Sequence, residues 1–392
     1  MFQISMPEAV KNIINKIYEC GYEAYIVGGC VRDSLLGREP YDFDITTSAL
    51  PEDVKAMFER TVDTGIEHGT VTVVMDGKGY EVTTYRIDGE YRDMRHPQTV
   101  SYTSEIKEDL SRRDFTVNAL AYNDKSGLVD VFGGIEDIEK KVIRCVRVPE
   151  ERFSEDALRV LRAIRFSSVL DFSIEELTAC AVHKFANRLN GISKERIFTE
   201  WKKLLSGKRA YDVIREYSDV IFEFLPELRE MKLLEKERFD ELLCDERQLV
   251  LFASFFGASE FTKAAENLKM DSKTKAIGIS VLNNLTLSDE YEDNALKRFI
   301  LFKDDEVSIK CARICYAIGR ISKVTKQRVE ELIASDSVRR VSQLNVNGND
   351  ILSLGLRGEN VGKTLSMLLY AVADGDVENE KQALLNYVMA NL

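Results

Sequence analysis

Apolar and polar positions alternate differently in the two parts of the chain. In residues 6–20 the apolar side chains recur with helical spacing and predict an amphipathic helix. β-rich runs at residues 25–27, 71–75 and 80–85 predict strands, and residues 76–79 between the last two are a hairpin signal. From about residue 104 the chain turns helical, and after residue 150 nearly all of it has helical spacing. The pattern predicts an α+β fold, with a small mixed head followed by a long all-helical remainder.

One further helix is expected after the first strands. Leu50-Pro51-Glu52-Asp53 has proline in the position of a first helical turn, and Ser48 is a candidate N-cap. Breaks in the apolar pattern near residues 145, 210 and 320 predict soft domain boundaries. We find no internal repeat or low-complexity tract.

Composition narrows the class of protein. The chain has 392 residues, enough for two or more domains. Its net charge of −12 argues against indiscriminate nucleic-acid binding, although a basic groove can lie within an acidic surface. No apolar run reaches about 18 residues, so no membrane-spanning helix is expected. The start lacks the pattern of a signal peptide, and the seven scattered cysteines favour reduced thiols in the cytoplasm.

Two aspartates separated by one residue are the strongest chemical signal. On a strand, the spacing of Asp42 and Asp44 places both carboxylates on the same side. A hard divalent cation such as Mg²⁺ prefers oxygen ligands of this kind, with substrate phosphates completing its shell. For an Asp-x-Asp pair that stands alone, a solvated strand end is the ordinary alternative.

A glycine pair stands upstream of the aspartates. Gly28 and Gly29 follow the expected strand at 25–27, and residues 31–36 read as a short helix. Glycines at such a turn let backbone N–H groups approach a phosphate closely. Arg32, at the start of that helix, can clamp a triphosphate or a ribose in fork geometry. A phosphate-binding turn followed by a metal-binding aspartate pair predicts nucleotidyl transfer.

The run from residue 28 to residue 45 resembles the signature of the class II tRNA nucleotidyltransferase and bacterial poly(A) polymerase family. The resemblance continues in Arg-Arg-Asp-Phe-Thr-Val-Asn-Ala at 112–119, is strong over residues 20–210 and is weak over 340–390. Together with the expected boundaries, it implies four parts. These are a polymerase-β-like nucleotidyltransferase head at 1–145, a neck of base-recognition helices at 146–210, a helical body at 211–320 and an RNA-binding helical tail at 321–392.

The resemblance also implies roles for single residues of the head. Glu81 would be the third carboxylate, either a general base near the primer hydroxyl or a support for the metals; a solvated glutamate on a strand face is the alternative. Arg113 would contact the nucleotide, while Asp114 and Asn118 would help to hold the ribose and the adjoining strand. Two Mg²⁺ ions roughly 3.5–4 Å apart at the aspartate pair would activate the attacking 3′-hydroxyl and neutralise the leaving pyrophosphate.

Arginines recur at every third position of residues 155–166. On a helix, Arg159, Arg162 and Arg165 form one slowly drifting stripe, with Asp156 one turn before Arg159 on the same side. The apolar residues between them are expected to bury the flanks and turn the stripe toward a cleft; a charged helix face is the simpler alternative. The family resemblance implies that Asp156 and Arg159 act as a protein template for cytosine or adenine, and that Arg162 and Arg165 contact phosphates. Uracil or guanine would leave buried polar groups unsatisfied.

Three further segments extend the resemblance. Residues 86–100 are dense in charge and contain glycine and proline, which predicts a loop. They look like the flexible loop that the family needs for the final A addition. Ser193 is expected to cap a neck helix in which Trp201 packs, and residues 344–363 resemble an RNA-contacting tail.

We therefore expect a cytoplasmic enzyme that adds C, C and A to the 3′ end of tRNA, using CTP and ATP and releasing pyrophosphate. Its helical part would hold the acceptor and T arms by shape and phosphates. A poly(A) polymerase, or an enzyme that adds only CC or only A, remains open. A catalytically silent RNA-binding or nucleotide-sensing protein is the alternative from another class, which the presence of Asp42, Asp44 and Arg113 disfavours. The sequence leaves the oligomeric state undetermined.

Overall fold

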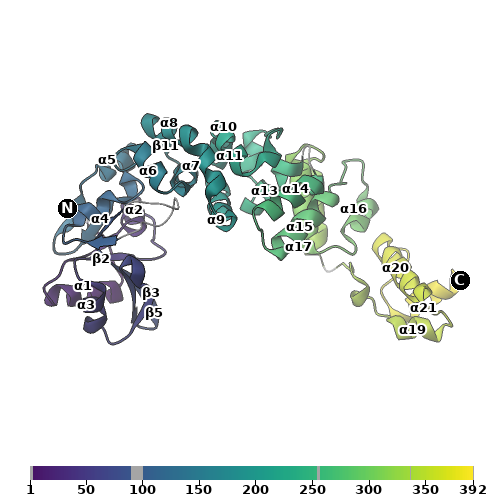
Figure 1. Cartoon of the computed structure of the whole chain (residues 1–392). Coiled ribbons are helices and arrows are strands. Elements are labelled where there is room, and N and C mark those ends of the chain that lie inside the picture. Colours follow the sequence, from purple (N-terminus) through teal and green to yellow (C-terminus); the bar gives the residue numbers. More distant parts are fainter. Residues whose placement is uncertain (1–2, 90–99, 254–256, 336, 392) are drawn as a thin grey trace. The chain divides into compact units, whose positions relative to one another are not determined.

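A computed structural model describes residues 3–89, 100–253, 257–335 and 337–391 of the chain (Figure 1). The chain divides into two compact units, Met1–Pro226 and Glu227–Leu392, and each is described by itself. Among the described helices, none is both long and apolar enough to cross a membrane. The α+β class predicted from the sequence is confirmed, because strands gather in the first unit and helices fill the second.

The head of the first unit is built on a mixed sheet. Within the described residues this sheet has seven strands, in the order β3-β4-β5-β2-β1-β8-β9. The β2–β5 pair is parallel and the other neighbours are antiparallel. The strands are β1 (Ala24–Val27), β2 (Ile45–Thr47), β3 (Thr61–Gly65), β4 (Thr70–Met75), β5 (Lys78–Thr84), β8 (Leu120–Asn123) and β9 (Gly127–Asp130). Since β1 and β2 are buried at every position, the aspartates before β2 stand at the edge of a rigid core.

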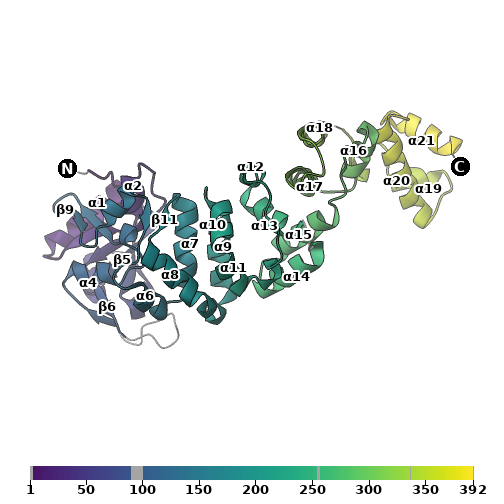
Figure 2. The ribbon, with the colours of Figure 1, turned by 90° about the horizontal axis from the view of Figure 1, so that it is seen from above.

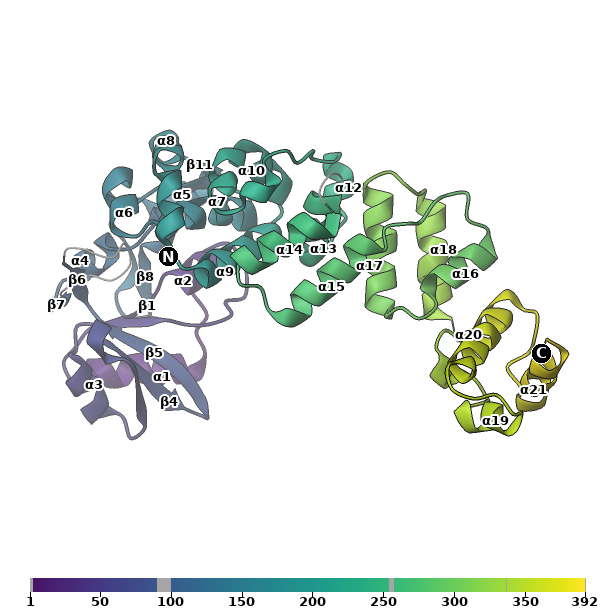
Figure 3. The same ribbon diagram turned by 45° about the vertical axis from the view of Figure 1, so that its right-hand side comes forward.

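Helices of the head agree with the apolar spacing. They are α1 (Glu8–Glu19), α2 (Gly29–Leu35), α3 (Pro51–Met57), α4 (Ile106–Ser111) and α5 (Gly134–Glu139). On α1 the predicted apolar face is buried, and α1 and α3 pack on the sheet (Figure 3). The N-cap of α3 is Leu50 and not Ser48 as predicted, because the Ser48 hydroxyl accepts a hydrogen bond from the Glu23 N–H instead.

Two other expectations for the head were wrong in part. The helical character expected from residue 104 is interrupted by β8 and β9. Their apolar runs are too short for the spacing of apolar residues to distinguish a strand from a helix. The hairpin is also tighter than predicted. Met75 pairs with Lys78, so the turn is Asp76-Gly77, and both residues have positive φ angles as a two-residue hairpin turn requires.

The charged segment predicted as a loop has strands at both ends. β6 (Arg86–Asp88) pairs with β7 (Val100–Tyr102) in a separate antiparallel ribbon. Residues 90–99, the larger part of the predicted loop, lie outside the described residues.

The rest of the first unit is a helical layer beyond the head. Its elements are β10 (Val142–Ile143), α6 (Pro149–Glu155), α7 (Leu158–Leu170), β11 (Ser173–Ile174), α8 (Glu176–Phe185), α9 (Lys194–Leu205), α10 (Ala210–Glu216) and α11 (Ser218–Phe224). Helix α7 packs against α9 and α10 (Figure 2). Ser193 is the N-cap residue of α9 and Trp201 is fully buried, as predicted.

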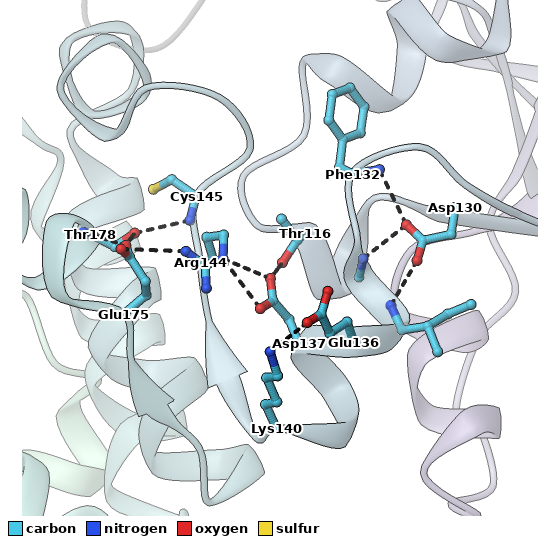
Figure 4. Close-up of polar contacts among 12 residues, drawn as sticks. Thr116, Asp130, Phe132, Glu136, Asp137, Lys140, Arg144, Cys145, Glu175 and Thr178 are labelled. Carbon is cyan, nitrogen blue, oxygen red and sulfur yellow. Dashed lines mark hydrogen bonds and ion pairs between the residues drawn. The ribbon is translucent and has the colours of Figure 1, made fainter.

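Polar side chains join the head to this helical layer (Figure 4). The guanidinium of Arg144 forms ion pairs with Asp137 of α5 at 3.1 Å and with Glu175, the N-cap residue of α8, at 3.4 Å. The Thr116 hydroxyl donates to the same Asp137 at 2.6 Å. These contacts, with the parallel β10–β11 pair, fix the position of α7 relative to the sheet.

The second unit is helical throughout its described part. Its helices are α12 (Lys236–Asp240), α13 (Cys244–Ala253), α14 (Gly257–Asn267), α15 (Ser272–Asn283), α16 (Asp293–Ile300), α17 (Asp305–Ala317), α18 (Lys323–Ala334), α19 (Gly348–Ser353), α20 (Glu359–Asp374) and α21 (Lys381–Ala390). The last three share one apolar cluster that includes Ile351, Leu368 and Leu384.

Candidate active site

The three predicted carboxylates line one cleft at the end of β2. We had expected Asp42 and Asp44 to lie within a strand. They lie instead in the segment directly before β2. Ile45 pairs with Val82 on the parallel neighbour β5. The preceding residues, Asp44 and Glu81, therefore stand side by side. The family resemblance had implied that Glu81 stands with the aspartates, and the strand register shows how it does so.

The three carboxylates also repel one another electrostatically. Burial raises the pKa of the Asp44 carboxyl, and the negative charges of Asp42 and Glu81 raise it further. The positive charge of the Arg113 guanidinium lowers the pKa of the same carboxyl. A cluster of mutually repelling carboxylates beside one cation is a site that favours a positively charged ligand.

The donor set fits a divalent metal only if substrate completes the shell. Within the described residues, no three Asp, Glu, His or Cys side chains converge closely enough to hold an ion by themselves. Asp42 and Asp44 can supply two carboxylates, and Mg²⁺ commonly takes one or two carboxylates together with substrate phosphates. The residues present therefore fit a metal that arrives with a nucleotide.

The backbone N–H of Gly28 is already paired within the head. Gly28 has a φ of +82° between β1 and α2, and its N–H donates to the Leu120 carbonyl at 3.0 Å. This N–H is therefore used by the sheet. A Cβ on Gly28 would lie 2.9 Å from Nη1 of Arg113, whereas a Cβ on Gly29 would lie 3.7 Å from Nη2 of Arg32. The glycines give two guanidinium groups room to approach the backbone.

Arg113 is held by a residue that the sequence analysis missed. Asp109 of α4 is completely buried, and its carboxylate accepts hydrogen bonds from Arg112 at 2.7 and 2.9 Å and from Arg113 at 3.5 Å. Thr46 of β2 donates to Oδ2 of this carboxylate, the oxygen that Arg113 contacts, at 3.2 Å. Burial alone would raise the pKa of Asp109, but the two arginines hold it below its usual range.

One nitrogen of Arg113 is left for a ligand. Its Nε is buried without a hydrogen-bond partner in the described part of the chain, and burial lowers the pKa of the guanidinium. An unpaired buried donor is unfavourable unless a ligand satisfies it. Arg113 is therefore placed to receive an anionic or oxygen-rich ligand next to the carboxylate cluster.

Asp114 and Asn118 form a second buried network. The Asn118 amide donates to Asp114 at 3.0 Å and accepts from Arg32, which also forms two 2.9 Å hydrogen bonds with Asp33. Arg162 donates to Asp114 at 2.6 and 2.8 Å. Burial by itself would raise the pKa of Asp114, but Arg162 and Asn118 hold it well below its usual range. The sequence-predicted residues of head and neck are thus joined directly.

The arginine stripe exists, but it is more enclosed than predicted. Arg159 and Arg165 are buried, while the side chain of Arg162 is 33% exposed. Asp156 is not on the helix of Arg159, because it is the C-cap residue of α6; its carboxylate accepts from the N–H of Leu158, the first residue of α7, at 3.0 Å. The stripe does not line the cleft that contains the carboxylates.

Each member of the stripe already has an intramolecular partner. Asp156 accepts from Arg196 of α9 at 3.2 Å, and Arg159 forms a 2.6 Å ion pair with Glu155. Arg165 pairs with Glu200 at 2.8 Å, and its guanidinium lies 3.4 Å from the ring centroid of Phe166.

Glu155, Arg196 and Glu200 were missed by the sequence analysis. Glu200 carried a usable signal, because an acidic residue on the apolar face of an amphipathic helix requires a buried partner.

Comparisons with known proteins agree with this arrangement. Residues 24–144 match the poly A polymerase head domain, residues 171–232 match the probable RNA and SrmB-binding site of polymerase A, and residues 245–388 match the putative domain 2 of tRNA nucleotidyltransferase. The chain is 35% identical to the CCA-adding enzyme of Ligilactobacillus salivarius, covering 95% of this chain and 94% of that protein. It is 37% identical to the CCA-adding enzyme of Geobacillus stearothermophilus, covering 96% and 95%.

Solved structures have the same fold. A crystal structure of the Bacillus stearothermophilus CCA-adding enzyme in complex with CTP has a TM-score of 0.79 and 32% identity, and the match covers 98% of each chain. The Thermotoga maritima CCA-adding enzyme complexed with tRNA has a TM-score of 0.72 at 22% identity over 99% of this chain and 97% of that one, which supports the fold alone.

Proposed function

The chain belongs to the family of CCA-adding enzymes, and from this premise we propose that it adds C, C and A to the 3′ end of tRNA, using CTP and ATP and releasing pyrophosphate. The observation that carries the proposal is the placement of Asp44 beside Glu81, with Arg113 and Gly28 on the other side of Asp44. Asp44 would thus take part both in binding metal, with Glu81 on one side, and in binding the nucleotide, with Arg113 on the other.

The proposed chemistry is an in-line displacement at the α-phosphorus. The 3′-hydroxyl oxygen of the RNA forms the new P–O bond, the bond to pyrophosphate breaks, and the hydroxyl proton passes to a base, for which Glu81 is the candidate. Asp42 and Asp44 would hold two Mg²⁺ ions, which supply charge neutralisation and a more acidic hydroxyl. Positioning and electrostatics account for most of such a transfer.

The nucleotide would bind on the arginine side of the carboxylates. Arg113, with its unpaired Nε, is the candidate contact for the triphosphate or ribose, and Arg32 and Asn118 form the adjoining wall. Arg162 and Arg165 would contact phosphates. Asp156 and Arg159 would read the edge of the base, which requires them to exchange their present partners, Arg196 and Glu155, for the nucleotide.

The four-part division of the chain belongs to the same proposal. Residues 1–145 would catalyse, 146–210 would select the base, and 211–320 and 321–392 would hold the acceptor and T arms of tRNA. A cytoplasmic location is supported by the seven cysteines, all of which are free thiols.

A direct assay separates this function from its rivals. The protein is incubated with Mg²⁺ and a tRNA that lacks its last three nucleotides, with each nucleoside triphosphate alone and with CTP and ATP together, and product lengths are read on a gel. We expect two additions with CTP and a third only when ATP follows. Long A tracts would identify a poly(A) polymerase, and arrest after two C residues or addition of A alone would identify a partial enzyme. No addition at all would leave a binding protein.

A further inference from the structure

A cleft lies beside the carboxylates and has no role in the proposed nucleotide binding. It has a volume of about 1140 Å³, and Asp42, Asp44 and Glu81 form part of its lining. The remaining walls come from the N-terminal segment 3–7, the stretch after α2 and the first residues of β5. None of Gly28, Arg32 and Arg113 lines this cleft. Asp44 faces both the cleft and Arg113. Its carboxyl borders the cleft, and the positive charge of Arg113 lowers the pKa of the same carboxyl.

The reaction geometry requires a second ligand there. In phosphoryl transfer the attacking and leaving oxygens lie roughly in line through phosphorus. A triphosphate held by Arg113 therefore has its attacking hydroxyl on the other side of the carboxylates. The cleft occupies that side and is large enough for a nucleotide.

The lining has the chemistry of a single-strand binding site. Tyr41, next to Asp42, is fully exposed at 101% relative accessibility, and Tyr80 adjoins Glu81. The side chains of Arg38 and Lys78 are exposed cations that form no ion pair or hydrogen bond within the described residues. Aromatic rings that stack on bases and cations that follow the backbone are the two elements of sequence-tolerant binding to single strands.

We propose that this cleft binds the 3′-terminal nucleotide of the RNA acceptor, with Tyr41 stacking on the terminal base and Lys78 and Arg38 binding the adjacent phosphate. The inference rests on the proposed function and deepens it. A stacking surface suits this reaction because the terminal base changes after each addition, and an aromatic ring accepts every base through its π face. Recognition by hydrogen bonds to base edges would have to change at each step.

The test uses minihelices of the tRNA acceptor and T arms that end before the CCA, after C or after CC. Steady-state kinetics are compared for the full-length protein and for Tyr41→Ala, Tyr41→Phe and Lys78→Ala. We expect Tyr41→Ala to raise the KM for all three minihelices by about tenfold, in line with the loss of one base–aromatic stack, and to leave the KM for CTP and ATP unchanged. Tyr41→Phe keeps the ring and should behave as the unchanged protein. Lys78→Ala should raise the RNA KM as well.

Lys140→Ala is the matched control. Lys140 is an exposed cation of the head that pairs only locally, with Glu136, and is absent from the cleft lining. Its replacement should leave the RNA KM unaltered. An unchanged RNA KM in Tyr41→Ala, or a change mainly in the nucleotide KM, overturns the subsite. If the unaltered protein fails to extend both tRNA and minihelices, the proposed function itself is at fault.

Cross-linking supplies a measurement that does not depend on turnover. A minihelix with 5-iodocytidine at its 3′ end is irradiated with the full-length protein, and the attached peptide is identified by mass spectrometry. Attachment at Tyr41 or Tyr80 is the expected result. Attachment confined to α7 or to residues beyond 226 would refute the assignment.

Discussion

The guanidinium of Arg113 lies against the backbone of Gly28, so that a Cβ added to Gly28 would stand 2.9 Å from Nη1 of Arg113. The two residues are far apart in the sequence, and their contact brings the turn after β1 to the arginine after α4. The φ of +82° at Gly28 adds a backbone reason for glycine at this position.

Gly28→Ala should therefore damage nucleotide binding and stability together. We expect the KM for CTP and ATP to rise about tenfold or more, because Arg113 must move, and the free energy of unfolding to fall by about 1–3 kcal/mol from backbone strain. Gly21→Ala is the control, since Gly21 has a φ of +86° but nothing lies within 4 Å of its added Cβ. It should lower the free energy of unfolding without altering the nucleotide KM. Equal kinetics in the two variants would contradict the proposed role of the contact.

Asp109→Asn should separate positioning of Arg113 from general stability. Neutralising this buried carboxylate leaves Arg112 and Arg113 without their counter-charge, which should reduce the free energy of unfolding by about 3–5 kcal/mol. The nucleotide KM should rise while the RNA KM stays near its original value. Glu246→Gln, at a 1% exposed carboxylate that pairs with Arg313 in the second unit, should destabilise without this kinetic effect.

The pH dependence of stability gives a second readout for Asp109. Its folded pKa lies below the ordinary value, so its stabilising effect is present above the unfolded pKa of about 3.9 and is lost as the pH falls through the folded pKa. Urea denaturation as a function of pH should show a smaller acid-induced loss in Asp109→Asn than in the unaltered protein. A parallel loss in both proteins would argue against the ion pairs with Arg112 and Arg113.

Asp44→Asn should abolish activity and yet stabilise the metal-free protein at neutral pH. The folded pKa of Asp44 is raised, so ionisation of this group opposes folding, and the effect grows as the pH rises above the unfolded pKa of about 3.9. In a chelator, the variant should melt at a higher temperature than the unaltered protein at about pH 7, and the difference should shrink toward about pH 4.

Catalysis gives the other half of the Asp44 test. Addition of both C and A should fall by more than about 100-fold, because a metal site contributes several kcal/mol to the transition state. Asp42→Ala should have the same effect on both nucleotides. A variant that keeps A addition after losing C addition would require a second active site.

Replacing Asp156 and Arg159 together with alanine should relax the choice of nucleotide. Each lost contact with the base edge should reduce discrimination against UTP or GTP by about 1–3 kcal/mol, by analogy with bidentate pairing to bases. The ratio of kcat/KM for CTP and UTP measures it. Equal slowing for all four nucleotides would show that these residues only position the substrate.

Local spacing singled out most of the candidate residues in this chain, and the family resemblance assigned most of their roles. The aspartate pair, the glycine turn, the Arg-Arg-Asp run and the arginine stripe are patterns within a few residues, where backbone geometry alone fixes which side chains share a face. The same reasoning predicted the buried face of α1 and the α+β class. It failed where a short apolar run had no distinctive period, as in β8, and where a helix was broken between Glu155 and Leu158.

Partners separated by long stretches of chain were not predictable in this way. Asp109 could have been suspected, because its spacing to Arg112 and Arg113 is that of ion pairs on a helix. The contact between Asp109 and Thr46 could not have been predicted, because it depends on how α4 packs over β2.

The sequence by itself determined which residues are the candidates for the chemistry and in which class of fold they stand, because these depend on residue type and local spacing. Only the tertiary structure decided which side chains meet: Asp44 with Glu81 through the register of β2 and β5, Gly28 with Arg113 across the sheet edge, and Arg165 with Glu200 between packed helices. The physical reason is that strand register and helix packing are set by the whole core, and a short segment of sequence holds no record of them.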